Sequence, residues 1–266
     1  MTAAPTYQLH TGSIPLLISM PHVGTTLAPE VAEQMTPVAQ HLDDTDWHLE
    51  QLYAFAAEMG ASVLVPTYSR YVIDLNRPPT DENLYPGVNT TGLLPMDTFN
   101  EEPLYDSDKR PTEAEKARRR ELYWQPYHQA LNDELTRLHA THGHALLWEA
   151  HSIRAHIPRL FEGRLPDFNF GTSSDQSALS GLAQELALLA QQDGQYSAVA
   201  NARFKGGYIT RHYGAPERGI HAVQLELAQC TYMDETRPYR YDAQRAGRLT
   251  PVIQRCLEHA LQRIKG

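Results

Sequence analysis

Two histidines and one glutamate stand at the ends of three apolar segments of the chain. His22 and His151 each follow such a segment, and Glu226 closes the third. Apolar runs of about seven residues bounded by turn residues are typical of buried strands in an α/β sheet. Ligands of open α/β sheets bind outside the carboxyl ends of the strands. The three side chains are therefore expected to converge at one edge of a sheet, a combination that favours metal-dependent hydrolysis.

The two histidines are candidate metal ligands. A neutral imidazole suits zinc, and a catalytic zinc takes three protein ligands and leaves a fourth position for water. No acid lies three residues after His22, so a compact His-x-x-Glu pair is absent from this position. The nearest acids open a predicted helix, where acids also serve as helix caps. Asp46 is the favoured third ligand beside His22 and His151, with Asp43 or Asp44 as alternatives.

Glu226 is the candidate general base. In a strand, Gln224 and Glu226 share one face while Leu225 lies on the other. A carboxylate at such a strand end could take a proton from water at a metal and return it to a leaving amine, or it could simply form a salt bridge. Glu149, two residues before His151, could orient that imidazole, or it could be an ordinary buried pair partner.

Several arginines lie close to the predicted strand ends, in a chain of net charge -9. A guanidinium binds a carboxylate through two parallel hydrogen bonds, so this concentration of arginine indicates a small anionic substrate. Most exposed arginines only solvate a surface, and two or three of these are expected to bind substrate. The candidate arginines are Arg70, Arg77, Arg154, Arg159 and Arg211, and Asn76 is a candidate together with Arg77, which follows it directly.

The composition excludes several classes of protein. The negative net charge argues against nucleic acid as a partner, because nucleic-acid-binding surfaces are basic. No segment resembles a membrane span or a secretory signal, so no membrane partner is expected. Cys230 and Cys256 are too few for a disulfide framework and fit a reduced, cytoplasmic location. The oligomeric state stays open.

The alternation of predicted elements indicates one α/β domain over residues 1–266, with a mixed, largely parallel sheet flanked by helices. Strands are predicted at 14–20, 61–66, 71–75, 144–150, 196–200 and 220–227, and helices at 44–59, 112–142, 176–192 and 241–264. Pro126 should kink the second of these helices. The long segments 76–111, 151–174 and 201–219 are rich in turn residues, and loops of this length are usually functional.

Six segments of the chain resemble the N-formylglutamate amidohydrolase (N-formylglutamate deformylase) family. They are SMPHVGTTLAP, DDTDWHLEQLY, SRYVIDLNRPP, LLWEAHSIRAHIPRLFEGRLPDFNFGT, FKGGYITRHYG and HAVQLELAQCTYMDE. The resemblance runs from about residue 7 to residue 260 and is most specific at 147–172. It implies hydrolysis of N-formyl-L-glutamate to formate and L-glutamate, the last step of one route of histidine breakdown. That family is similar to the zinc carboxypeptidases and aspartoacylases, which implies a zinc-carboxypeptidase-like fold.

The resemblance also implies roles for individual residues. It puts His22 and His151 on Zn²⁺ or another divalent ion such as Co²⁺, and Glu226 in the role of base. It puts Asn76 and Arg77 on a substrate carboxylate. This chain lacks the acid three residues after the first histidine, so Asp46 takes that place on grounds of position.

The glutamate moiety has two carboxylates, so more than one arginine is expected to bind it. Arg70, close in sequence to the Asn-Arg step, is expected to stabilise the oxyanion. Arg154, Arg159 and Arg211 are candidates for the side-chain carboxylate. Two alternatives use the same residues: a metallohydrolase of other N-acyl amino acids or of peptide C-termini, and a non-catalytic amino-acid-binding relative.

Overall fold

A seven-stranded mixed sheet forms the centre of the computed structural model, which describes residues 5–84, 87 and 90–265. The strands are β1 Tyr7–His10, β2 Leu16–Ser19, β3 Ser62–Pro66, β4 Ala145–Ile153, β5 Phe168–Gly171, β6 Ala198–Ala200 and β7 Ile220–Ala228. Their order in the sheet is β1-β3-β2-β4-β7-β5-β6. The pairs β3–β2, β2–β4, β4–β7 and β5–β6 are parallel, whereas β1–β3 and β7–β5 are antiparallel. The predicted mixed, largely parallel sheet is thus confirmed.

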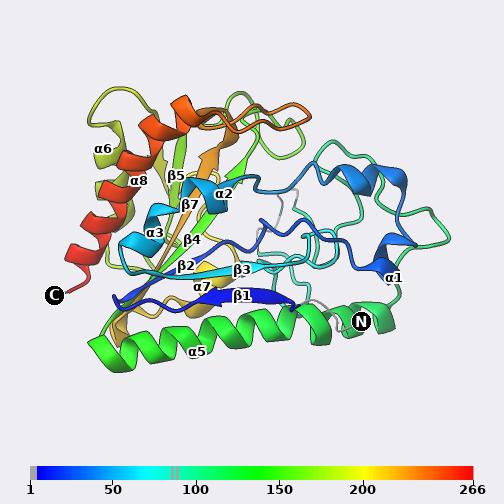
Figure 1. Ribbon diagram of the computed structural model, residues 1–266, viewed down its shortest axis with the longest axis horizontal. Coiled ribbons are helices and arrows are strands. Elements are labelled where there is room, and N and C mark those ends of the chain that lie inside the picture. Colours follow the sequence, from blue (N-terminus) through cyan, green and yellow to red (C-terminus); the bar gives the residue numbers. More distant parts are fainter. Residues whose placement is uncertain (1–4, 85–86, 88–89, 266) are drawn as a thin grey trace.

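Helices cover both faces of this sheet. They are α1 Pro29–Ala32, α2 Leu49–Leu52, α3 Phe55–Glu58, α4 Glu113–Arg119, α5 Gln125–His142, α6 Leu182–Gln191, α7 Tyr208–Tyr213 and α8 Ala243–Arg263. The long helix α5 runs along one side of the sheet, and α6 and α8 lie together on the opposite side (Figure 1). The predicted α/β fold with flanking helices is therefore confirmed.

Neighbouring residues of the central strands pack into different hydrophobic cores. Leu16 and Ile18 of β2 belong to a cluster that contains Leu257 of α8, whereas Leu17 belongs to a second cluster with Leu131 of α5. Successive side chains of a strand point to opposite faces of the sheet, so a strand covered on both faces is apolar throughout. This is why the apolar runs in the sequence identified the central strands.

One predicted strand is wrong, because the segment from Tyr71 to Leu75 forms turns. Its apolar side chains are nevertheless buried: Tyr71, Val72, Ile73 and Leu75 are all part of the second core. A short apolar run signals burial and leaves the backbone conformation open.

The helix predicted at 44–59 is also wrong in its extent. The structure has two four-residue helices there, α2 and α3, and His48 before α2 has a left-handed backbone conformation with φ 62°. The helix predicted at 176–192 begins only at Leu182. The disturbance expected at Pro126 takes the form of a π turn at Arg120–Trp124, directly before α5.

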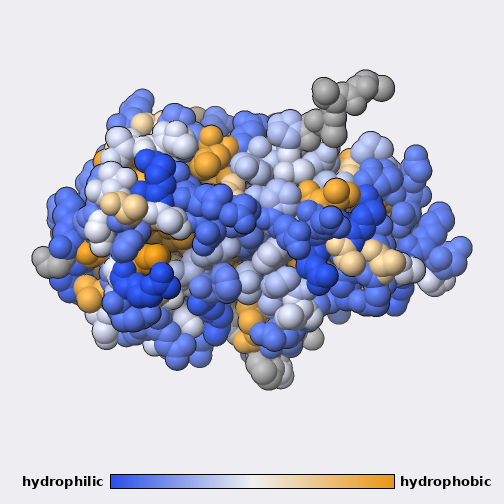
Figure 2. All heavy atoms as spheres, turned by 90° about the horizontal axis from the view of Figure 1, so that it is seen from below, coloured by the Kyte–Doolittle hydropathy of each residue, from blue (hydrophilic) through white to orange (hydrophobic). Residues whose placement is uncertain are grey.

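Four of these strands and helices went unpredicted, namely α1, β1, β5 and α7. The last of these lies within the segment 201–219 that the sequence indicated as a loop. The surface in Figure 2 is mostly hydrophilic, with small and separate hydrophobic areas. Among the described residues, none of the helices combines the length and apolar character needed to cross a bilayer.

Candidate metal centre and active-site pocket

Three adjacent parallel strands bring the predicted residues to one pocket. His22 follows β2, His151 lies near the end of β4, and Glu226 lies near the end of β7. In the β4–β7 ladder, His151 and Glu226 are register partners. All three side chains line the same pocket, as the expected convergence at a sheet edge requires.

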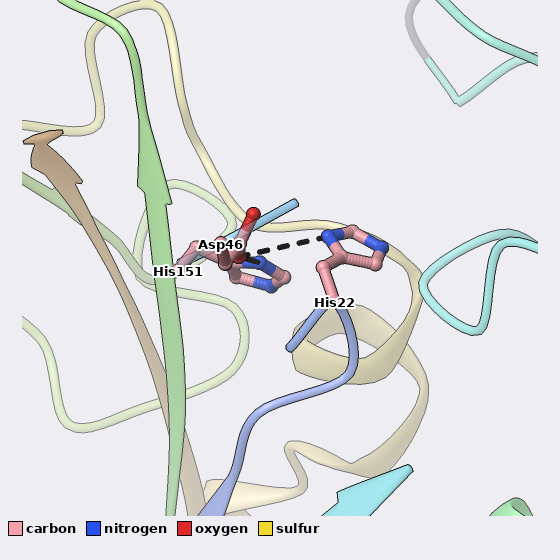
Figure 3. Close-up of side chains that lie close together, drawn as sticks. All are labelled: His22, Asp46 and His151. Carbon is pink, nitrogen blue, oxygen red and sulfur yellow. Dashed lines mark hydrogen bonds and ion pairs between the residues drawn. The ribbon is translucent and has the colours of Figure 1, made fainter. Parts of the chain in front are cut away.

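His22, Asp46 and His151 form a buried cluster of possible metal ligands. One ligand atom from each lies within 4.8 Å of the others. Figure 3 shows the Asp46 carboxylate between the two imidazole rings, with His151 on its strand and His22 on the loop after β2. Asp46 Oδ2 is 2.9 Å from Nδ1 of His151 and 3.8 Å from Nδ1 of His22. The backbone N–H of Asp46 donates to the His22 carbonyl at 3.1 Å, which joins the two segments.

The two alternative acids have other partners. Asp43 accepts a hydrogen bond from Nε of Arg237 at 2.8 Å, and Asp44 accepts one from the backbone N–H of Phe99 at 2.9 Å. Of the three acids at the predicted helix start, Asp46 is the one that the structure brings together with both imidazoles.

Each imidazole has its outer nitrogen against a buried carboxylate. His22 Nε2 lies 2.7 Å from Asp74 Oδ1, and His151 Nε2 lies 2.8 Å from Glu149 Oε1. Carboxylates in this position fix the orientation of a metal-ligating histidine and raise its basicity. Nδ1 of both rings is consequently the atom that faces Asp46. The sequence pointed to Glu149, whereas Asp74 lies in the segment mistaken for a strand.

The protonation of the two rings follows from their neighbours. Burial, together with Arg70, lowers the pKa of His22, so its neutral form donates Nε2–H to Asp74 and keeps the Nδ1 lone pair. Burial alone would lower the pKa of His151, but the carboxylates of Glu149 and Asp46 outweigh it and raise that pKa well above its usual range. Metal ligands must be deprotonated, so a cation bound at Nδ1 would replace a proton there.

Asp74 is expected to control metal affinity, because its carboxylate accepts from the His22 ring, from Arg70 and from the Asn76 backbone. We expect Asp74→Asn to weaken metal binding about 10–100-fold, the usual effect of removing such an outer carboxylate. Titration of the folded protein against a competing chelator measures this. The exposed Asp106→Asn is the control, and an unchanged affinity in Asp74→Asn would contradict the role.

Arg70 is held next to the cluster of possible metal ligands. Its guanidinium donates to Asp74 Oδ2 at 2.6 Å and approaches His22 Nδ1 to 3.2 Å. The Phe99 ring packs against it, with the guanidinium carbon 4.9 Å from the ring centroid. Because Arg70 lines the pocket, its charge is available to an oxygen atom close to the two histidines.

Glu226 is buried in the same pocket as the cluster. Burial raises the pKa of its carboxyl group well above the usual range. Gln224 Nε2 lies 3.4 Å from Glu226 Oε2, and Gln224 Oε1 accepts the Gly207 N–H at 2.7 Å. Because the Gly207 N–H must point to an oxygen, the Oε1 end of the Gln224 amide faces Gly207. The NH₂ group of Gln224 therefore faces Glu226.

Asn76 and Arg77, which the sequence predicts to bind a substrate carboxylate, also line the pocket. Asn76 Oδ1 accepts the Ile209 N–H at 2.9 Å, and Arg77 Nε–H donates to the Thr91 carbonyl at 2.7 Å. A Cβ atom added to Gly207 would lie 2.3 Å from the Asn76 side chain, so only glycine fits beside it.

Helix α7 joins this group to the metal-ligand cluster. Thr210 donates both its backbone N–H, at 3.1 Å, and its hydroxyl to Oε2 of Glu149. The other oxygen of Glu149 faces the ring of His151. One buried carboxylate therefore holds the second histidine and the start of the helix together.

Two of the predicted arginines support loops. Arg154 donates to the Asn100 side chain at 3.0 Å, and Arg159 donates to the Thr98 carbonyl at 2.7 Å. Both contacts fix the turn that carries Phe99. Neither arginine belongs to the described lining of the pocket.

Arg211 likewise lies outside that lining and donates from Nε to the Gly206 carbonyl at 2.9 Å. The lining includes Arg203, which the sequence did not single out. Arg203 stands between β6 and α7, and no periodic pattern in this segment marks it as different from the neighbouring arginines.

This chain is similar to known proteins in sequence and in fold. The family model described as N-formylglutamate amidohydrolase matches residues 14–233. An N-formylglutamate deformylase of Pseudomonas aeruginosa is 53% identical, with 94% of each chain covered, and one of Pseudomonas putida is 51% identical, with 95% of this chain and 94% of the relative covered. A crystal structure of N-formylglutamate amidohydrolase from Ralstonia eutropha has a TM-score of 0.80 and 25% identity over 97% of this chain and 98% of that one. This chain belongs to the N-formylglutamate amidohydrolase family.

Proposed function

We propose that this chain hydrolyses N-formyl-L-glutamate to formate and L-glutamate. Two relatives that share half of its residues bear the name N-formylglutamate deformylase, which supports this substrate. The observation that carries the proposal is the juxtaposition of the His22, Asp46 and His151 cluster with Glu226 in one buried pocket.

We propose a divalent metal ion, Zn²⁺ or a substitute such as Co²⁺, on His22, Asp46 and His151. The donor set fits, because two imidazole nitrogens and a carboxylate lie within 4.8 Å of one another and both rings are backed by carboxylates. Three protein ligands leave a fourth position open. When bound, the ion would act as a Lewis acid toward the formyl carbonyl and toward water.

Glu226 is the proposed general base. It would take a proton from the water that attacks the formyl carbon, and return that proton to the amide nitrogen as the carbon–nitrogen bond breaks. Burial favours the neutral form of this carboxyl group, so Glu226 can hold the proton between the two steps. Its register partner His151 keeps it beside the metal ligands.

Arg70, Asn76 and Arg77 are proposed to bind the charges of the reacting molecule. Arg70 lies against His22 and would stabilise negative charge that develops on the formyl oxygen. Asn76 and Arg77 would hold the α-carboxylate of the glutamate moiety. The hydrogen bonds of Asn76 to α7 and of Arg77 to Thr91 fix both groups in advance, which supports this role.

Chelation tests the metal requirement and the substrate in one assay. Formate release from N-formyl-L-glutamate is expected before chelation, to be lost after it, and to return when Zn²⁺ or Co²⁺ is added. N-acetyl-L-glutamate and N-formyl-L-aspartate serve as comparison substrates and should react more slowly. A protein that releases no formate after loading with either metal would refute the proposed reaction.

A further inference from the structure

The pocket contains an arginine for which the proposed mechanism has no use. Among the described residues, its lining includes Arg70, Arg77 and Arg203. Arg70 lies beside His22, and Arg77 follows Asn76 in the chain. Arg203 reaches the same pocket from the segment after β6. It is thus a third positive charge from an independent part of the fold.

Arg203 has several apolar neighbours. Its Nε–H donates to the Leu160 carbonyl at 2.8 Å, and its guanidinium carbon lies 5.3 Å from the centroid of the Phe204 ring. Leu160, Phe204 and Ile153 line the pocket as well, and all three belong to or pack against one small hydrophobic cluster. The Nε–H bond fixes the plane of the guanidinium, and the apolar neighbours strengthen its attraction for an anion.

This combination matches the side chain of glutamate. Two methylene groups followed by a carboxylate require an apolar wall and, beyond it, a cation that binds two oxygens. Ile153, Leu160 and Phe204 provide such a wall, and Arg203 provides the cation. Arg154, Arg159 and Arg211 stand outside the described lining, so the geometry favours Arg203 over all three.

We infer that Arg203 is the residue that binds the side-chain carboxylate of the substrate and selects glutamate over neutral amino acids. The inference rests on the proposed function. The α-carboxylate is assigned to Asn76 and Arg77, and the formyl oxygen to Arg70, which leaves Arg203 for the second carboxylate. A neutral side chain cannot form the charge-assisted hydrogen bonds that a carboxylate forms with this guanidinium, and that difference is the source of the selectivity.

The test compares N-formyl-L-glutamate with N-formyl-L-glutamine, which has the same shape and no side-chain charge. Arg203→Gln is expected to lower kcat/KM for the charged substrate about 30–100-fold, mainly through KM, as the loss of a charge-assisted hydrogen-bonded pair predicts. For N-formyl-L-glutamine the same variant should change kcat/KM less than about threefold, because no ion pair is lost. Arg203→Lys keeps the charge and should recover part of the selectivity.

The exposed Arg218→Gln is the matched control and should behave as the wild type does with both substrates. If Arg203 only supported the Leu160 loop, Arg203→Gln would slow both substrates equally, and that result would overturn the inference. Unchanged kinetics in Arg203→Gln would overturn it as well. A metal-loaded wild-type protein that hydrolyses neither substrate would instead refute the proposed function, and the inference with it.

Discussion

The His151→Ala variant is expected to lose both bound metal and formate release. This histidine contacts Asp46 through Nδ1 and Glu149 through Nε2, so the substitution removes a proposed ligand and the group between two buried carboxylates. Metal-ion catalysis supplies several kcal/mol of charge stabilisation, so kcat/KM should fall by about 10³-fold or more. Metal content of the purified protein and formate release measured on the same sample test both parts.

His156→Ala is the matched control for this variant, because His156 is an exposed histidine on the same segment. His22→Ala serves as a second variant, with circular dichroism to establish that each protein is folded. A folded His151→Ala protein that keeps stoichiometric metal and normal turnover would remove this residue from the metal centre.

Glu226→Gln is expected to separate metal binding from catalysis. The amide keeps the shape of the carboxyl group and cannot accept the proton from water. Because Glu226 is not one of the three proposed ligands, metal content should stay at the wild-type level. The turnover number should fall by about 10²–10⁴-fold, the usual size of a general acid–base contribution.

Steady-state formate release and metal analysis of the same preparation measure this separation. Glu217→Gln, an exposed substitution just before β7, should leave both quantities unchanged. Near-normal turnover in Glu226→Gln would show that another group accepts the proton. Loss of metal in that variant would place Glu226 among the ligands.

The sequence was sufficient to predict the centre of this sheet and the residues at its edge. β2, β4 and β7 are apolar on both faces because α5 covers one side and α8 the other. Parallel strands end on the same edge, so His22, His151 and Glu226 could be placed together without knowledge of the register. Position alone also favoured Asp46, whose backbone hydrogen bond to His22 brings it there.

The residues that the sequence missed depend on contacts between distant segments. Helix α7 has only six residues, and its first turn donates to Asn76 and Glu149, which lie far away in the chain. Asp74 and Arg203 owe their importance to neighbours from other loops. The spacing of residues in the sequence carries no information about contacts between such distant segments. The charge of Arg154 and Arg159 makes both candidates for substrate binding, whereas the structure uses both to hold a turn.

The order of the strands along the sequence determines when this pocket can form during folding. The segments that follow β2, β4 and β7 stand side by side in space but are separated by most of the sequence. Pairing strands so distant in the chain incurs the entropy of closing long loops, which makes such contacts slow to form. A nascent chain that ends before β7 already carries His22 and His151 but lacks the Glu226 carboxylate. The pocket is therefore complete only when β7 has paired with β4, and a chain that stops before β7 lacks the proposed general base.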